Sequence, residues 1–295
     1  HEESGETIME SFVSRFLARL EERKSVLCVG LDPAMRVTRA KNVIYRKKHL
    51  RREAIRLNFC LDMLDQTADY AIAAKVNEQY MFGFTIREHM ILSRHIQSRG
   101  LLSIYDCNLG DIGETAESKL FEIQHVGYDA ITVQAHPGNL KQIVEYAHRW
   151  NPPIGVMVST LMSNPEATKY FKESKLNNRP VYFAIAEDVK RYGADGCVVG
   201  ATKPVTEDDI EAIRRIVGED KVFLVPGVGT QKGNPEKVIR AAGENILINV
   251  GRDIIYSNNP RRKAEKYCRT FNEIRSTYGK ARIGTLNSWM TRDIK

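Results

Sequence analysis

Apolar runs and amphipathic segments alternate along the chain with the spacing of β-strands and α-helices. Short, nearly continuous apolar runs, typical of buried parallel strands, occur at residues 26–31, 71–77, 101–105, 130–134, 154–158, 196–200, 222–225 and 246–250. Segments with helical spacing occur at residues 9–22, 55–64, 85–99, 114–125, 139–150, 183–192, 207–217, 235–242 and 260–278. The pattern predicts a chain built from repeated strand–helix units.

Eight strand–helix units close a (β/α)8 TIM barrel, an α/β fold that typically needs about 250 residues. The 295-residue chain fits this fold as one domain over residues 1–295. A doubly wound open sheet is the alternative, although it usually has fewer strands at such even spacing. We expect an N-terminal helix at about residues 6–23 and a C-terminal extension at residues 279–295 that lies outside the alternation.

Composition excludes several classes of protein. A hydrophobic fraction of 42% and a charged fraction of 27% are typical of soluble globular proteins, and no apolar run approaches the roughly 20 residues that span a membrane. The N-terminus lacks the pattern of a signal peptide, so we expect a cytoplasmic protein. The five cysteines are scattered without C-x-x-C spacing, which indicates neither a disulfide framework nor a zinc site.

The net charge of +7 favours anionic partners. Basic residues cluster at residues 46–52 and 261–263, in segments predicted to be helices or to lead into them, where a solvated face is the simpler interpretation. No aromatic residues interleave with them as a nucleic-acid groove would require. The net charge alone does not choose between a phosphorylated small molecule and nucleic acid, but the placement of the basic residues argues against a nucleic-acid groove.

Polar residues gather where the predicted strands end. They are Asp32, Lys75, Asp106, Asn108, Asp111, Ser163, Lys203, Gln231 and Arg252. In a barrel these positions share one rim, which carries the functional groups. Asp106 and Asn108 are two residues apart, so a strand would place both on one face. The alternative is a turn in which both side chains bind only local backbone.

Two glycine-containing loops follow the last two predicted strands, at residues 226–233 and 251–253. Barrels often bind phosphate between these loops, where backbone N–H groups and the start of a short helix approach the oxygens. Arg252 adds a charged fork, and Gln231 adds an amide. The pattern favours a phosphate site over glycines that only form tight turns.

Residues 106–113, Asp-Cys-Asn-Leu-Gly-Asp-Ile-Gly, resemble the Asp-x-Lys-x-x-Asp-Ile signature of the orotidine 5′-monophosphate (OMP) decarboxylase family. Leu31-Asp32 and Lys75 precede this signature as they do in that family. Similar motifs follow in order at residues 162–165, 199–202, 226–231 and 249–256. The resemblance spans roughly residues 26–256.

The resemblance implies decarboxylation of OMP to UMP without metal or cofactor, in a homodimer with shared active sites. It implies that Lys75, Asp106, the position of Asn108 and Asp111 are catalytic. Asp32 and Lys75 would hold the ribose, Ser163 would face the pyrimidine, and Gln231, Gly251 and Arg252 would bind the 5′-phosphate. Asp111, Ile112 and Thr115 would reach into the site of the neighbouring subunit.

The sequence departs from the family at Asn108, where the signature has lysine. An amide carries no charge and cannot supply a proton near neutral pH, so the resemblance implies an impaired enzyme. The alternatives are an introduced substitution, a natural homologue that binds nucleotides without turnover, and a site in which another lysine, such as Lys203, serves. Without the cation, Asp106 or Asp111 is expected to have a raised pKa.

Two rival functions remain at this point. A phosphosugar enzyme resembling hexulose-phosphate synthase would hold magnesium with carboxylates, but Lys75 and Gln134 occupy the ends of the second and fourth predicted strands. A non-catalytic nucleotide sensor would bind UMP or OMP without converting either.

Overall fold

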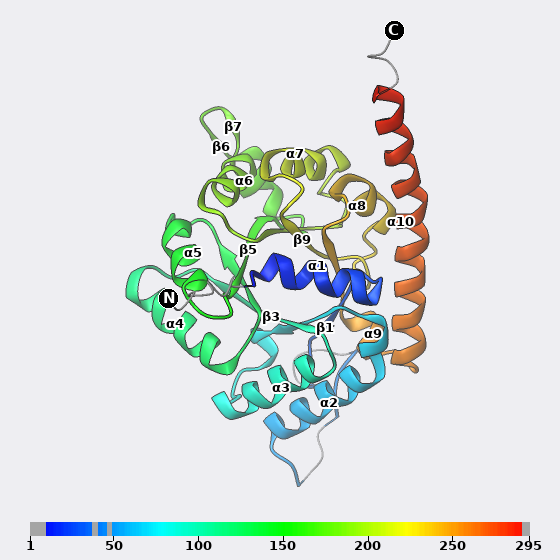
Figure 1. Ribbon diagram of the computed structural model, residues 1–295. Helices are drawn as coiled ribbons and strands as arrows, with labels where there is room; N and C mark the ends of the chain where they lie inside the picture. The colour runs from blue at the N-terminus through cyan, green and yellow to red at the C-terminus, as the bar shows by residue number, and fades with distance from the viewer. Residues whose placement is uncertain (1–9, 37–40, 46–48, 291–295) are drawn as a thin grey trace, which may run out of the picture.

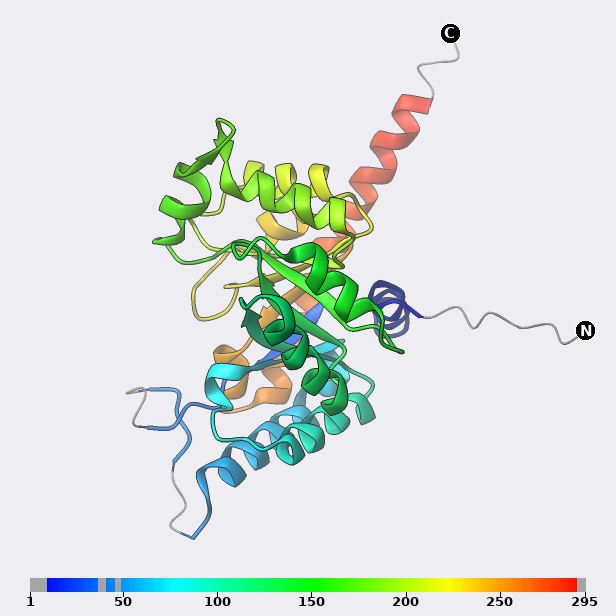
Figure 2. The same ribbon diagram turned by 90° about the vertical axis from the view of Figure 1, so that its left-hand side faces the viewer.

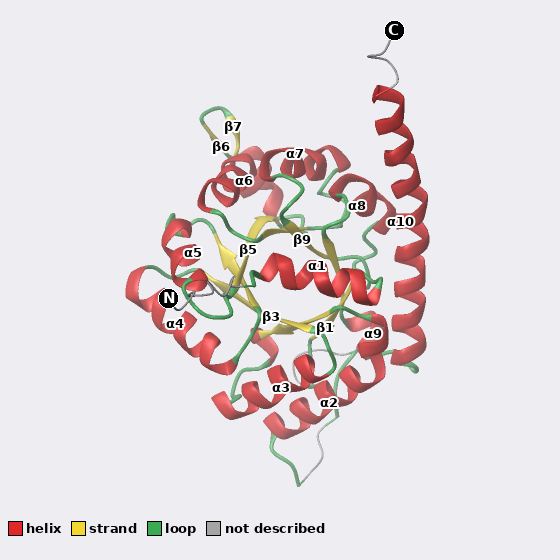
Figure 3. Ribbon diagram, in the orientation of Figure 1, coloured by secondary structure: helices red, strands yellow, loops and turns green. Residues whose placement is uncertain are grey.

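The computed structural model describes residues 10–36, 41–45 and 49–290, with side chains described as far as Tyr278. Eight parallel strands form a closed barrel in the order β1-β10-β9-β8-β5-β4-β3-β2 (Figure 3). The strands are β1 Leu27–Leu31, β2 Ala73–Asn77, β3 Leu102–Leu109, β4 Ala130–Gln134, β5 Gly155–Leu161, β8 Gly196–Val199, β9 Val222–Pro226 and β10 Ile246–Val250. The predicted (β/α)8 barrel is confirmed.

Helices surround the barrel, except α1, which lies across one of its ends (Figure 1). The described α-helices are α1 Phe12–Arg23, α2 Arg52–Thr67, α3 Ile86–Ser98, α4 Gly113–Val126, α5 Leu140–His148, α6 Val181–Tyr192, α7 Glu207–Val217, α8 Pro235–Ala242, α9 Arg252–Ile255 and α10 Pro260–Met290. The connection between β5 and α6 carries a small hairpin of β6 Lys175–Leu176 and β7 Arg179–Pro180. No described helix is long and apolar enough to cross a membrane.

Helix α1 closes one end of the barrel. Ser11 caps it by accepting a hydrogen bond from the backbone N–H of Ser14, and Phe12 and Phe16 are fully buried against the residues inside the barrel. In the turned view, α1 lies at one end and the described residues 41–45, which follow β1, lie at the other (Figure 2). A site at the carboxyl ends of the strands must therefore open on the face opposite α1.

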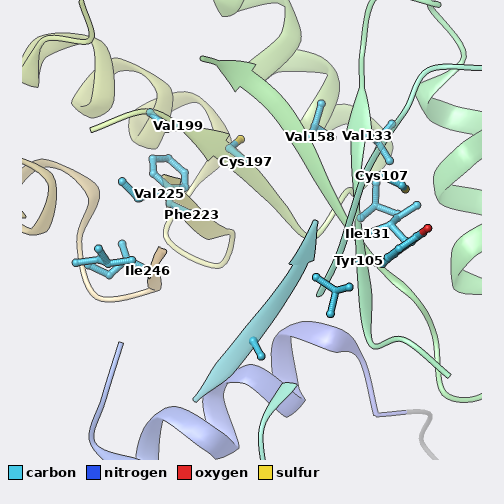
Figure 4. Packing of buried hydrophobic residues seen from close by; sticks show 14 of the residues in the cluster. Tyr105, Cys107, Ile131, Val133, Val158, Cys197, Val199, Phe223, Val225 and Ile246 are labelled. Atoms are coloured by element: carbon cyan, nitrogen blue, oxygen red, sulfur yellow. The ribbon is translucent and has the colours of Figure 1, made fainter. Parts of the chain in front are cut away.

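The side chains of each strand alternate between the barrel interior and the surrounding helices. On β3, Ile104 belongs to the inner cluster. Tyr105 and Cys107 belong to the outer cluster, part of which is shown in Figure 4. The period of two places Asp106 and Asn108 in line with Ile104. Apolar side chains thus fill the lower interior, and polar side chains replace them toward the open end.

Two elements extend beyond their predicted ends. The β3 strand continues past Tyr105 to Leu109, with a shift in its pairing to β4 between these residues. Helix α10 continues past Tyr278 to Met290, into the segment predicted as an extension. Helix α1 begins at Phe12, and the part of the N-terminal helix predicted before residue 10 lies outside the described residues.

Candidate functional site

A cavity of about 240 Å³ lies at the carboxyl ends of the strands, opposite α1. It is lined by Asp32, Lys75, Asn77, Asp106, Ser163, Pro226, Gly227, Gly229, Thr230, Gln231, Asn249, Gly251 and Arg252. Six of these, namely Asp32, Lys75, Asp106, Ser163, Gln231 and Arg252, are rim residues expected from the sequence. The fold therefore gathers groups from most of the chain around one small polar space.

A buried ion pair forms one wall of this cavity. The ammonium of Lys75 binds Oδ2 of Asp106, and neither side chain is more than 16% exposed. Burial opposes the charge of Lys75, but the carboxylates of Asp106 and Asp32 outweigh it and raise the pKa of the lysine. Burial likewise opposes the charge of Asp106, but the attraction of Lys75 and its hydrogen bond lower the pKa of the aspartate.

The expected rise in pKa is not found at Asp106. Asn108 brings no charge to Asp106, but the ammonium of Lys75 remains in contact with this carboxylate. Hydrogen bonds from the Thr132 hydroxyl, at 2.8 Å, and the Asn108 amide, at 3.1 Å, also favour the ionised form. Asp106 is thus held as a carboxylate with a fixed orientation.

Asn108 lies at the irregular end of β3. Its backbone has a φ of 47°, which asparagine tolerates better than most residues. Its Nδ2 donates to Asp106, while its Oδ1 accepts from Gln134 Nε2 at 3.0 Å and Ser159 Oγ at 3.3 Å. An uncharged and hydrogen-bonded amide therefore occupies this position.

The loops after β9 and β10 form the other wall. Gly229 and Gln231 come from the first loop, and Gly251 and Arg252 from the second. The guanidinium of Arg252 forms no ion pair with any side chain that the structure describes. The predicted phosphate-binding groups are therefore brought together, with a cation available to an anion.

Other predicted site residues do not line the cavity, and one of them is Asn108, which is exposed near the end of β3 and contacts the cavity-lining Asp106. Asp111, Ile112 and Thr115 are exposed at the start of α4, and Oδ1 of Asp111 accepts the backbone N–H of Ile112. Lys203 is also exposed and lies outside the cavity lining. Lys203 is thus not among the groups that surround the Lys75–Asp106 pair in this cavity.

Comparison with known proteins identifies the family. The model of the "Orotidine 5'-phosphate decarboxylase / HUMPS family" matches residues 25–267. The chain belongs to this family. It is 30% identical over 295 residues to the orotidine 5′-phosphate decarboxylase of Cupriavidus necator, covering 93% of this chain and all of that one. The chain is accordingly a carboxy-lyase of UMP biosynthesis.

Solved structures agree. The OMP decarboxylase of Leishmania donovani matches with a TM-score of 0.73 and 26% identity, over 90% of this chain and 98% of that chain. The UMP synthase of the same organism matches with a TM-score of 0.75 and 28% identity over 90% of this chain. The present chain spans 56% of the length of that UMP synthase.

Sequence analysis missed several polar groups of this decarboxylase-family site. Thr132, Ser159 and Asn249 lie inside strands that otherwise read as apolar, and Asn77 lies at the end of β2. A signal did exist, because a polar residue at an inward position of a buried strand needs a partner. Finding it required knowing which residues of each strand point inward.

A larger cavity, of about 520 Å³, lies between α3 and α4 and has a different character. Its lining includes Phe84, His89, Tyr105 and Tyr128, and the Glu78–Lys119 ion pair lies at its edge. None of the predicted rim residues lines it. We therefore assign the site to the smaller cavity, where charged groups converge.

The ring of His89 makes the stability of this region sensitive to acid. Burial lowers its pKa to about 4, with Lys119 acting in the same direction and Glu78 and Glu88 opposing it. Because the folded protein disfavours the charged ring, this contribution is complete above the unfolded pKa of about 6.5 and is lost as the pH falls toward 4. Relative to neutral pH, we expect protonation of His89 to lower the free energy of unfolding by up to about 3 kcal/mol at pH 4.

Urea denaturation of the chain and of His89→Asn between pH 7 and pH 4 measures this effect. The asparagine variant should lose less stability than the parent over that interval, because carboxylate titration is common to both. Equal losses would contradict the assignment.

Proposed function

We propose that the chain binds OMP and UMP in the cavity at the strand ends and decarboxylates OMP slowly, because Asn108 stands at the position of the family's catalytic lysine. The observation that carries the proposal is the hydrogen-bonded Asn108 amide beside the intact Lys75–Asp106 pair. The cavity beside Asn108 carries charged and polar groups that can bind the parts of a nucleoside monophosphate.

We assign to the residues the roles that the family resemblance implies, and their presence in one cavity is compatible with these roles. Arg252, Gln231 and Gly251 bind the 5′-phosphate between the last two loops. Asp32 and Lys75 hold the ribose, and Ser163 lies on the side of the pyrimidine. Asp106 is placed against the carboxylate that leaves C6 of the ring, where its fixed charge disfavours the bound substrate relative to the transition state.

The slow decarboxylation that we propose follows from the lack of a proton donor at C6. Loss of CO2 leaves a carbanion at C6, which a nearby ammonium would stabilise and protonate. Lys75 does not replace that ammonium, because it is bound to Asp106 and its pKa is raised. The Asn108 amide can neither neutralise the carbanion nor release a proton near neutral pH.

Calorimetric titration with UMP and ultraviolet assay of OMP turnover test the proposal together. We expect UMP to bind in the micromolar range or tighter and turnover to be slow. A rate typical of efficient enzymes, with kcat of about 10 s⁻¹ or more, would show that Asn108 does not impair the site. Absence of UMP binding would refute the assignment of the cavity.

The nucleotide-sensor alternative has one supporting observation. The Asn108 carbonyl oxygen has two donors and its amide has the Asp106 acceptor, so the position is well accommodated without a cation. A sensor would bind UMP and OMP but show no turnover under any substitution at residue 108.

A second copy of the chain would complete the site. Ile112 is 59% exposed at the start of α4, and Phe82 is 88% exposed near α3. Exposed large apolar side chains of this kind are typical of contact surfaces. We expect the partner's segment around Asp111, Ile112 and Thr115 to close the open side of the cavity.

The variant Ile112→Glu tests this dimer. Placing a carboxylate in an apolar contact should shift the protein toward monomer in sedimentation velocity and weaken UMP binding. The matched control is Leu176→Glu, since Leu176 is 55% exposed on the β6–β7 hairpin. A dimer that survives Ile112→Glu unchanged would contradict the proposed contact.

A further inference from the structure

Asn249 is an unexplained polar residue in the cavity wall. It lies on β10 among Ile246, Leu247, Ile248 and Val250. Its Oδ1 is buried and has no hydrogen-bond partner among the residues that the structure describes. A buried acceptor without a donor costs about 1–3 kcal/mol, so a polar group at this position calls for a ligand or a water molecule.

The backbone of Gly30 makes room for this amide. A Cβ on Gly30 would lie 3.0 Å from Oδ1 and 3.3 Å from Nδ2 of Asn249, so the amide occupies the space that a side chain on β1 would take. Gly30 pairs in register with Lys75 on β2. The missing side chain thus leaves Lys75 and Asn249 on either side of one strand, at the floor of the same cavity.

The donors and acceptors at this floor are complementary to a sugar diol. An ammonium has three N–H donors, and Asp106 takes one from Lys75. Asp32 also lines the cavity, where its carboxylate influences the charge of Lys75. A ligand hydroxyl can accept from Lys75 and donate to Asp32 or Asn249, whereas an ionised phosphate or carboxylate cannot donate at all.

We propose that Asn249 determines specificity for the sugar by accepting a hydrogen bond from a ribose hydroxyl of the bound nucleotide. This inference rests on the proposed function, because it assumes that the cavity takes a nucleoside monophosphate. With Asp32 and Asn249 as acceptors and Lys75 as donor, both hydroxyls of a ribose find partners. A nucleotide that lacks the hydroxyl facing Asn249 leaves the amide oxygen unsatisfied.

Calorimetric titration of the full chain with UMP, 2′-deoxy-UMP and 3′-deoxy-UMP tests the inference. We expect UMP to bind about tenfold more tightly than one of the two deoxy analogues because of this contact. In Asn249→Leu, UMP affinity should fall by about the same factor, the affinity for that analogue should hold, and the preference should disappear. Asn249→Asp keeps an acceptor and should keep the preference, even if its added charge weakens all three nucleotides.

The outcomes separate this inference from the proposed function. Failure of UMP to bind the parent chain overturns both. Binding of UMP with an unchanged preference in Asn249→Leu overturns the role of Asn249 alone and assigns the amide oxygen to a water molecule. The leucine variant should retain its thermal midpoint, because it removes an unsatisfied buried acceptor. If it does not fold, loss of the preference in Asn249→Asp overturns the inference instead.

Discussion

Replacing Asn108 with lysine is expected to raise the rate of OMP decarboxylation by about a thousandfold or more. A positioned general acid typically contributes 10²–10⁴-fold, and a fixed charge at a developing carbanion contributes a similar factor. The substituted ammonium would lie beside Asp106, where Nδ2 of Asn108 now donates at 3.1 Å. The measurement is the decrease in ultraviolet absorbance of OMP, for the parent and the variant side by side.

The control for this experiment is Asn108→Met, because the methionine side chain is nearly as long as that of lysine but carries no charge. It should remain as slow as the parent, because the gain depends on the ammonium rather than on filling space. Silence from both variants, with UMP still bound, would establish a nucleotide-binding protein without turnover. Equal gains from lysine and methionine would show that Asn108 obstructs the site sterically.

Replacing Arg252 with alanine is expected to weaken UMP binding about a hundredfold. Hydrogen bonds to a charged partner contribute about 1.5–3 kcal/mol each, and a guanidinium can form two to one phosphate. The loss should be confined to the phosphate, so uridine should bind the parent and the variant equally. Calorimetry with both ligands measures the difference.

Arg262→Ala is the matched control for Arg252→Ala. Arg262 is an exposed arginine on α10 and does not line the site cavity. Its replacement should change UMP affinity little, apart from a small effect of net charge that salt screens. If uridine binding falls as much as UMP binding in Arg252→Ala, the arginine supports the loop rather than binding the phosphate.

The alternation of apolar runs carried the fold prediction, because a fully buried parallel strand has a recognisable composition. The same reasoning located Asp106 and Asn108 on one face of a strand, and the 3.1 Å hydrogen bond between them agrees with that placement. It ended the strand too early, at Tyr105, because polar residues usually mark a turn. In this barrel they continue β3 to Leu109 and face inward.

Other features of the site depend on contacts that one strand cannot reveal. Ser159 reaches Asn108 only because β5 and β3 both flank β4. The low pKa of Asp106 depends on Lys75, which comes from a different strand. The amide oxygen of Asn249 has no donor in the described structure, and the sequence alone does not reveal this.

Because α1 closes one end of the barrel, it affects the kinetics of substrate binding and product release. Phe12 and Phe16 are buried in the interior below the polar layer, so in the described structure a nucleotide would enter and leave at the carboxyl ends of the strands. Substrate and product would therefore use the same opening, and each would have to dissociate before the other could bind. Product inhibition should then be purely competitive, and a tightly held UMP would set the pace of turnover even in a variant whose chemistry is fast.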